Sequence, residues 1–292
     1  MDIENHISDD YGLLPLWDSL YKIYEEFAKI CERHGLRYYA LGGTALGAVR
    51  HNGFIPWDDD FDVAMPRPDY ERFKNLYSKE LPGHLKFGNW TNMPGYQKLF
   101  GKILDTRKDV VVALEKKLGF VLSNGVFIDV FPLDGYPESA FRRWRIRIKH
   151  WWMAFVWHYL TRRPEDCSPK GKLARIIGMC LMAVIPQWRG IHNLLKIYEN
   201  DAMSIPYDES RLVSDVSTFT DIFHRKPQSR DSWGNGKEHP FFGKKIRLPA
   251  SPDDPLTSRY GKDYMVLPPL IKRHPTHTEK IHHPWWLGPT GE

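Results

Sequence analysis

The sequence is poor in cysteine. Its 292 residues include three, Cys31, Cys167 and Cys180, which are far apart and odd in number. A disulfide framework needs an even set, and a structural zinc site needs closely spaced Cys or His ligands. We therefore expect free thiols and neither kind of stabilisation.

Long hydrophobic runs are also missing. The two longest, residues 151–156 and 176–185, are shorter than the ~20 residues that a membrane-spanning helix needs. The polar, acidic beginning MDIENHISDDYG does not match the pattern of a signal or transit peptide. We therefore expect a cytoplasmic protein that does not span the membrane.

Internal repeats and low-complexity tracts are absent, and the net charge is only +5. Apolar residues make up 42% of the chain, which is ordinary for a globular protein. The length suits one elaborated domain or a core with a helical appendage. Without a base-reading module or a large positive charge, nucleic-acid binding is not expected.

The most informative stretch is residues 38–66, YYALGGTALGAVRHNGFIPWDDDFDVAMP. Residues 38–41 read as a strand, and a glycine turn, Gly42-Gly43-Thr44, opens a short helix over residues 45–50. A loop follows, and then a second strand that carries Asp60 and Asp62. Residues two apart on a strand face the same way, so we expect these two carboxylates to lie together.

A metal–phosphate site would explain this combination. Two neighbouring carboxylates repel each other and are normally kept with a cation, and oxygen ligands of this kind suit Mg²⁺. Glycines allow a close approach to a ligand, and free N–H groups at a helix start bind phosphate. We therefore expect Gly42, Gly43 and Thr44 to bind phosphate. Each motif taken alone is more often a solvated turn or strand end.

A third aspartate, Asp129, lies in the strand-like run GVFIDVFPLD at residues 125–134. Its neighbours are large and apolar, and an unpaired buried acid is costly. Asp129 must therefore cap something locally or meet a cation. Asp134 precedes a glycine and is predicted to be a turn residue.

Basic side chains near these aspartates could bind the phosphates of a donor and stabilise charge during transfer. Arg50 and Lys102 are the main candidates. Weaker ones are Lys98, Arg67, Lys272 and Arg273, because most cations are merely solvated.

Residues 139–200 differ in character from the rest. The segment FRRWRIRIKHWWMAFVWHYLTRR and a second basic cluster at residues 170–175 stand beside apolar helical runs. Basic residues next to tryptophan-rich helices fit a lipid–water interface. A helical lobe that packs on the sheet, with its cations in water, fits equally well.

The remaining segments predict helices over residues 13–33 and 68–79, strands over 84–90 and 98–104, and a hairpin near residues 241–249. We divide the chain into a catalytic core at residues 1–137, a helical region at 138–205 and a C-terminal segment at 206–292 that returns to the core. The fold class is α+β, with a mixed sheet flanked by helices.

The aspartate stretch resembles the signature of the LicD family of phosphorylcholine transferases, which includes the fukutin and fukutin-related transferases. The matching residues are Gly42-Gly43-Thr44, Gly47, Arg50, residues 53–60, Asp62, Met65-Pro66-Arg67, residues 127–134, residues 260–265 and Leu267-Pro268-Pro269. They touch both ends of the chain but not residues 139–237.

The resemblance implies a nucleotidyltransferase-like fold in which Asp60, Asp62 and Asp129 hold Mg²⁺ or Mn²⁺. It implies CDP-choline as the donor and a surface glycan, such as lipopolysaccharide or its lipid-linked precursor, as the acceptor. Such an enzyme could be peripheral at the inner face of the cytoplasmic membrane. Choline would need an aromatic cage; Trp57 and Trp90 are candidates, although packing explains each of them better.

Two alternatives stay open. The donor could carry ribitol, glycerol or ethanolamine phosphate in place of phosphocholine, as in the wider family. The chain could also be a non-catalytic adaptor at a membrane surface, although the intact aspartates argue against a relic site.

Overall fold

A computed structural model describes residues 11–96, 98–107, 111–112, 126–161, 169–184, 191–215, 226–275 and 278–280. Cys167, expected to be a free thiol, lies outside these ranges. The helices are α1 (Leu14–Arg33), α2 (Gly42–His51), α3 (Arg67–Glu80), α5 (Ala140–Thr161), α6 (Pro169–Val184), α7 (Ile191–Met203), α9 (Arg230–Trp233) and α10 (Asp253–Tyr260), with 3-10 turns η3 (Tyr207–Glu209) and η4 (Leu270–Lys272).

The strands are short except for one. They are β1 (Tyr39–Ala40), β2 (Asp62–Pro66), β3 (Leu85–Gly88), β4 (Gly101–Asp105), β5 (Val111–Val112), β6 (Val126–Tyr136), β7 (Leu212–Ser214), β8 (Gln228–Ser229), β9 (Lys237–Phe241), β10 (Lys244–Leu248) and β11 (Thr278–Lys280).

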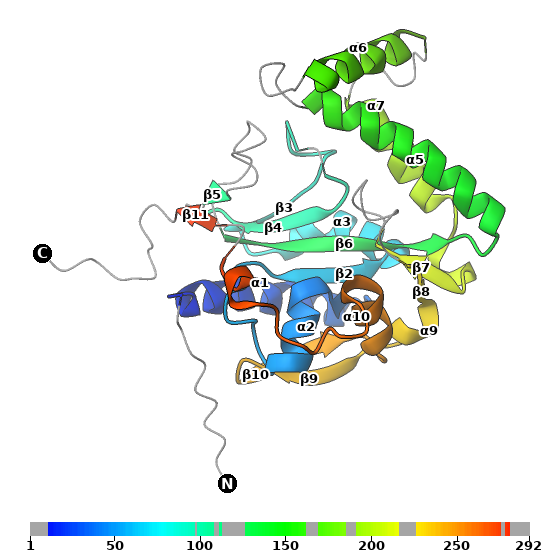
Figure 1. The fold of residues 1–292 in the computed structure, drawn as a ribbon. Helices are drawn as coiled ribbons and strands as arrows, with labels where there is room; N and C mark the ends of the chain where they lie inside the picture. Colours follow the sequence, from blue (N-terminus) through cyan, green and yellow to red (C-terminus); the bar gives the residue numbers. More distant parts are fainter. Residues whose placement is uncertain are drawn as a thin grey trace, which may run out of the picture.

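The main sheet is mixed and is built around the long strand β6 (Figure 1). The strand order is β1-β2-β6-β4-β3, and β7 and β8 continue from the far end of β6. The β2–β6 pair is parallel, whereas the other pairs in this sheet are antiparallel. The predicted α+β class, a mixed sheet flanked by helices, is confirmed.

Strand β2 separates two apolar clusters. Val63 and Met65 belong to the main core with the adjoining Phe61, whereas Ala64 belongs to a second cluster on the other face. The predicted alternation is therefore confirmed for these apolar positions. The strand begins at Asp62, however, so Asp60 lies in the preceding loop and not on the strand, contrary to the prediction.

Helix α1 covers the main core. Its apolar residues recur at helical spacing, and the buried ones include Leu16, Leu20 and Phe27. The chain leaves the helix through Gly35, whose φ of +60° is a left-handed conformation that glycine adopts without strain. The sequence-based prediction of this helix is confirmed.

The C-terminal segment returns to the sheet at several points. Strand β7 pairs with the end of β6, and the β9–β10 hairpin packs near β1. Helix α10 packs against α2, next to the start of β2. The predicted hairpin is confirmed, and its turn is formed by Phe242 and Gly243, both with positive φ.

Helices α5, α6 and α7 form a lobe that projects from the end of β6 (Figure 1). Helix α7 packs on β6 and α5, and the His150 ring of α5 lies 4.2 Å from the Tyr198 ring of α7, between centroids, with the ring planes tilted by 32°. Across the described residues, no helix combines the length and the apolar composition needed to cross a bilayer.

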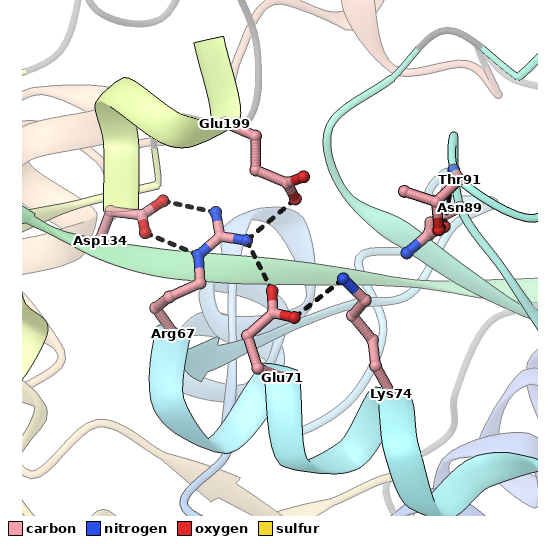
Figure 2. Close-up of polar contacts among 7 residues, drawn as sticks. All are labelled: Arg67, Glu71, Lys74, Asn89, Thr91, Asp134 and Glu199. Carbon is pink, nitrogen blue, oxygen red and sulfur yellow. Dashed lines mark hydrogen bonds and ion pairs between the residues drawn. The ribbon is translucent and has the colours of Figure 1, made fainter. Parts of the chain in front are cut away.

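A buried ion-pair network joins the lobe to the sheet (Figure 2). Arg67, at the start of α3, donates two hydrogen bonds of 2.7 Å to the carboxylate of Asp134 on β6. It also contacts Glu71 at 3.3 Å and Glu199 of α7 at 3.2 Å. Burial raises the pKa of Glu199 more than the Arg67 charge lowers it.

This network corrects two predictions. Asp134 is not a turn residue, because it lies within β6 and is only 1% exposed. Arg67 was a weaker candidate for phosphate binding, but its guanidinium is held by three carboxylates and is 8% exposed. The two signature segments Met65-Pro66-Arg67 and residues 127–134 thus contact each other through this pair, which has a structural role.

Candidate active site

Two of the three predicted aspartates lie side by side. Asp62 at the start of β2 is in register with Asp129 of β6, and the two strands run parallel. The Asp129 N–H donates to the Phe61 carbonyl at 2.9 Å, so the pairing continues one residue before β2. Residues in register on adjacent strands face the same side of a sheet. Both carboxylates therefore rise from the sheet face that carries Ala64 and Phe131.

The start of helix α2 is fixed against this pair. The Asp62 N–H donates to the Thr44 hydroxyl at 2.8 Å, and the Leu41 N–H donates to the Asp62 carbonyl at 3.0 Å. Thr44 is therefore used to tie α2 to β2. The predicted glycine turn is itself the first turn of α2, which begins at Gly42.

Gly42 leaves room for the Asp62 carboxylate. Its φ is +59°, and a Cβ at this position would lie 2.7 Å from Asp62 Oδ2. A Cβ on Gly43 would likewise collide with the Asp58 carboxylate. The two glycines thus allow carboxylates to approach the helix N-terminus, where a negative charge is favourable. A phosphate at this place would have to share it with Asp58 and Asp62.

Four carboxylates gather before and at the start of β2, from Asp58, Asp59, Asp60 and Asp62. The pKa of Asp58 lies well above its usual range, first because of burial and then because of the charges of the other three. Such mutual repulsion is what a bound cation relieves. The chemistry of this donor set, all carboxylate oxygen, fits a hard divalent ion.

Asp129 meets a cation within the protein. The Nζ atom of Lys102, directly opposite on β4, lies 2.7 Å from Asp129 Oδ1. Lys102 is only 2% exposed, and its ammonium lies 3.4 Å from the centroid of the Phe127 ring. The structure therefore places Lys102, a predicted phosphate ligand, in an ion pair with a predicted metal ligand.

The described residues contain no arrangement of three or more His, Cys, Asp or Glu side chains with the geometry of a metal site. The charges of Asp60 and Asp62 are nevertheless close enough to raise the pKa of Asp58. Asp129, in register with Asp62, faces the same side of the sheet and is held by Lys102.

Arg50 holds the C-terminal segment. Its guanidinium donates to the carbonyls of Tyr264 at 3.0 Å and Val266 at 3.4 Å, and to His51 Nε2 at 3.0 Å. Burial lowers the pKa of Arg50, and a partial compensation comes from Tyr260 and Asp58. Arg50, another predicted phosphate ligand, therefore joins α2 to the segment that follows α10.

Arg259 and Tyr260 are site residues that the sequence reasoning did not single out. The Arg259 guanidinium lies against Gly42, where a Cβ would be 3.4 Å from its Cζ and Nη2, and it contacts Asp215 at 3.1 Å. Tyr260 is 42% exposed as a residue, but desolvation raises its pKa; Arg259 lowers this pKa, and the Asp58, Asp62 and Asp60 charges raise it further. The only signal was the position of these residues at the start of the signature segment 260–265.

The remaining candidates are the weaker phosphate ligands and the two tryptophans considered for a choline cage. Arg273 stacks on the Trp57 ring at 5.6 Å, so one proposed cage residue already faces a cation. Trp90 packs in a separate cluster with Leu195 and Tyr198 of α7. Lys272 is exposed in η4, and Lys98 lies 5.3 Å from the Phe100 ring. The assignment of Trp57 or Trp90 to a choline-binding cage thus stays a prediction.

The part of the chain that contains these residues is similar in sequence to known proteins. Residues 35–162 match the family model "LicD/FKTN/FKRP, nucleotidyltransferase domain". This part of the chain belongs to that family. The matched range contains α2, β2 and β6, and with them all three predicted aspartates.

Three individual proteins are similar to the chain in sequence. The chain is 26% identical over 263 residues to the lipopolysaccharide cholinephosphotransferase LicD of Haemophilus influenzae, which covers 89% of this chain and 94% of that protein. It is 39% identical over 51 residues to the human ribitol 5-phosphate transferase FKRP, covering 18% of this chain and 10% of that protein. An uncharacterised protein of Rickettsia typhi is 36% identical over 121 residues, or 41% of this chain and 36% of that protein.

The role of Gly42 can be tested directly. We expect Gly42→Ala to lose activity by about 10²-fold, because the new Cβ displaces the Asp62 carboxylate as well as straining the backbone by ~1–2 kcal/mol. Gly35→Ala is a matched control, since Gly35 has a φ of +60° but open space around its Cβ. Unfolding and transfer assays should show similar destabilisation in both variants and inactivation in Gly42→Ala alone; equal activities would contradict the assignment.

Proposed function

We propose that the chain transfers phosphocholine from CDP-choline to a hydroxyl group of a cell-surface glycan or its lipid-linked precursor, with release of CMP. The observation that carries this proposal is the in-register pair Asp62 and Asp129 beside the start of α2, inside the matched nucleotidyltransferase domain. The name of the Haemophilus relative supports phosphocholine as the group transferred.

In this proposal, Asp60, Asp62 and Asp129 hold Mg²⁺ or Mn²⁺, and the ion neutralises charge on the donor diphosphate. The chain's own residues bind and orient the donor. The N–H groups at the start of α2 would take the donor phosphate beside the Asp62 carboxylate, for which Gly42 makes room. Arg259, beside Gly42, adds a positive charge where the leaving CMP develops negative charge.

Lys102 has two functions in this proposal. It holds Asp129 in place before the donor binds, and it offers an ammonium next to the site afterwards. Because Lys102 is buried among the rings of Phe100 and Phe127, its ammonium can move only a short way. The acceptor hydroxyl must lose a proton during transfer, and Asp129 is our candidate for the base.

A second candidate donor follows from the relatives. The human protein of matched sequence is named a ribitol 5-phosphate transferase, so CDP-ribitol is a plausible alternative with the same mechanism. CDP-glycerol and CDP-ethanolamine would use the same phosphate chemistry. A lipid-linked acceptor would place the enzyme peripherally at the inner face of the cytoplasmic membrane.

The donor is tested by CMP release. Purified protein is incubated with Mg²⁺, an acceptor extract and, separately, CDP-choline, CDP-ribitol, CDP-glycerol or CDP-ethanolamine. We expect CMP release and labelled acceptor with CDP-choline. Release with another CDP donor alone would keep the transfer mechanism and replace phosphocholine, whereas no release with any donor would favour the adaptor alternative.

A further inference from the structure

The α5–α6 lobe carries an apolar stripe that the rest of the described chain leaves exposed. On α5 the stripe consists of Phe141 (66% exposed), Trp144 (57%), Ile148 (41%), Trp151 (49%) and Trp152 (39%). At ~100° per residue these positions fall within an arc of about 100° on the helix surface. Such a stripe normally faces a protein core, so its exposure requires an explanation.

The opposite side of α5 is already used. His150, about 150° from the middle of the stripe, is 2% exposed and lies against the Tyr198 ring of α7. Arg143, on the same side, donates to the Pro137 carbonyl at 3.1 Å. The orientation of α5 is therefore fixed by α7 and by the end of β6, and this orientation turns the stripe outward.

Helix α6 extends the apolar surface. Leu173, Ile176, Ile177 and Met179 are between 44% and 60% exposed, and α6 packs against α5. Figure 1 shows α6 at the end of the lobe away from the sheet. Both of these packed helices thus leave apolar side chains exposed.

The charge of the two helices is of one sign. Their sequences contain eight Lys and Arg residues and no Asp or Glu. Arg142 and Arg145 are exposed at the edge of the α5 stripe, and Lys172 is exposed beside Leu173 on α6. Arg142 and Arg145 also line a hollow of about 430 Å³ with Trp144 and Ile148, and on its α7 side Asp201 pairs with Lys149 at 2.6 Å, which leaves the two arginines as the cations there without that partner. The stripe is thus bordered by cations.

We propose that the exposed face of α5 and α6, consisting of the residues named above, binds an anionic phospholipid surface. Tryptophan prefers the headgroup region of a bilayer, aliphatic side chains enter the acyl boundary, and basic side chains pair with lipid phosphate. No described helix is long and apolar enough to span the bilayer, so the helices lie on it. The charge complementarity favours an anionic membrane over a second copy of the chain, whose own α5–α6 face is equally positive.

The experiment is flotation of the full-length protein with phosphatidylcholine vesicles that contain or lack phosphatidylglycerol, without any nucleotide. We expect binding to the anionic vesicles only. Binding should fall steeply between about 0.1 M and about 1 M salt, as the Debye length shortens from ~10 Å to ~3 Å. This readout is independent of donor chemistry, so it can fail while the proposed transfer reaction holds.

Two variants locate the surface. Trp144→Ala with Trp151→Ala removes the aromatic contacts, and Arg142→Gln with Arg145→Gln removes two cations. Each should weaken vesicle binding by about tenfold or more. Leu270→Ser with Ile271→Ser is the matched control, because these residues are more exposed, at 77% and 82%, but lie in η4 away from the lobe. Circular dichroism of each variant should match that of the wild type, which checks that the variant is folded.

Several outcomes would overturn the proposal. They are absence of vesicle binding by the wild type, equal binding to neutral vesicles, and loss of binding in the control but not in the α5 variants. A wild type that does not float but is dimeric, and that becomes monomeric when Trp144 and Trp151 are replaced, would assign the face to a contact between copies. Retained salt-sensitive binding in both α5 variants would place the lipid surface elsewhere.

Discussion

Replacing Asp62 with asparagine is expected to lower the rate of CMP release by about 10³-fold or more, at the upper end of what one electrostatic group contributes. The substitution keeps the size of the side chain, and the backbone N–H of residue 62 can still donate to Thr44. What is lost is the charge beside Asp129 and the start of α2. The fold should therefore survive while the proposed metal site does not.

The matched control is Asp18→Asn, because Asp18 is an exposed carboxylate whose ion pair with Lys22 lies on the surface of α1. Its activity should equal that of the wild type. Asp129→Asn should lose activity and also stability, since it removes the carboxylate with which the buried Lys102 is paired. An Asp62→Asn variant with more than about a tenth of wild-type activity would contradict the account.

Replacing Arg67 with methionine is expected to reduce the free energy of unfolding by about 3–5 kcal/mol, the usual effect of removing one partner from a buried ion pair. Asp134 is 1% exposed and would be left without the guanidinium that pairs with it. Glu199 of α7 would lose the same partner, so the contact between the lobe and the sheet should weaken as well.

Urea denaturation measures this effect, with Arg33→Met as the matched control. Arg33 pairs with Glu80 at the surface and is 61% exposed, so its loss should cost no more than ~1 kcal/mol. The folded fraction of Arg67→Met should keep its transfer activity, because Arg67 does not reach the carboxylates of the site. A loss of stability equal to that of the control, or a selective loss of activity, would show that Arg67 has the phosphate-binding role given up above.

Local sequence patterns predicted most elements of the core. Helix α1, the hairpin β9–β10 and the apolar alternation of β2 follow from spacing and turn residues that act over a few positions. Asp129 was expected either to cap something or to meet a cation, and Lys102 is that cation. The identity of this cation depends on β4 lying next to β6, and no local pattern specifies the order of strands in a sheet.

The other differences between prediction and structure also arise from contacts between segments that are distant in the sequence. Asp134 was assigned to a turn because a glycine follows it, but β6 continues to Tyr136, and Arg67 from α3 satisfies the buried charge. Arg259 comes close to Gly42 only because α10 folds back onto α2. Local patterns thus indicated the elements around β2, whereas partners from distant segments became visible only in three dimensions.

The central claim is that the carboxylates around Asp62 use a divalent cation to move a substituted phosphate. The most direct measurement is CMP release from CDP-choline with acceptor extract, in protein first treated with EDTA and then supplied with Mg²⁺ or Mn²⁺. The account predicts no release after chelation, full recovery with added metal, and no recovery in Asp62→Asn. Release that continues undiminished in the chelated protein would contradict it.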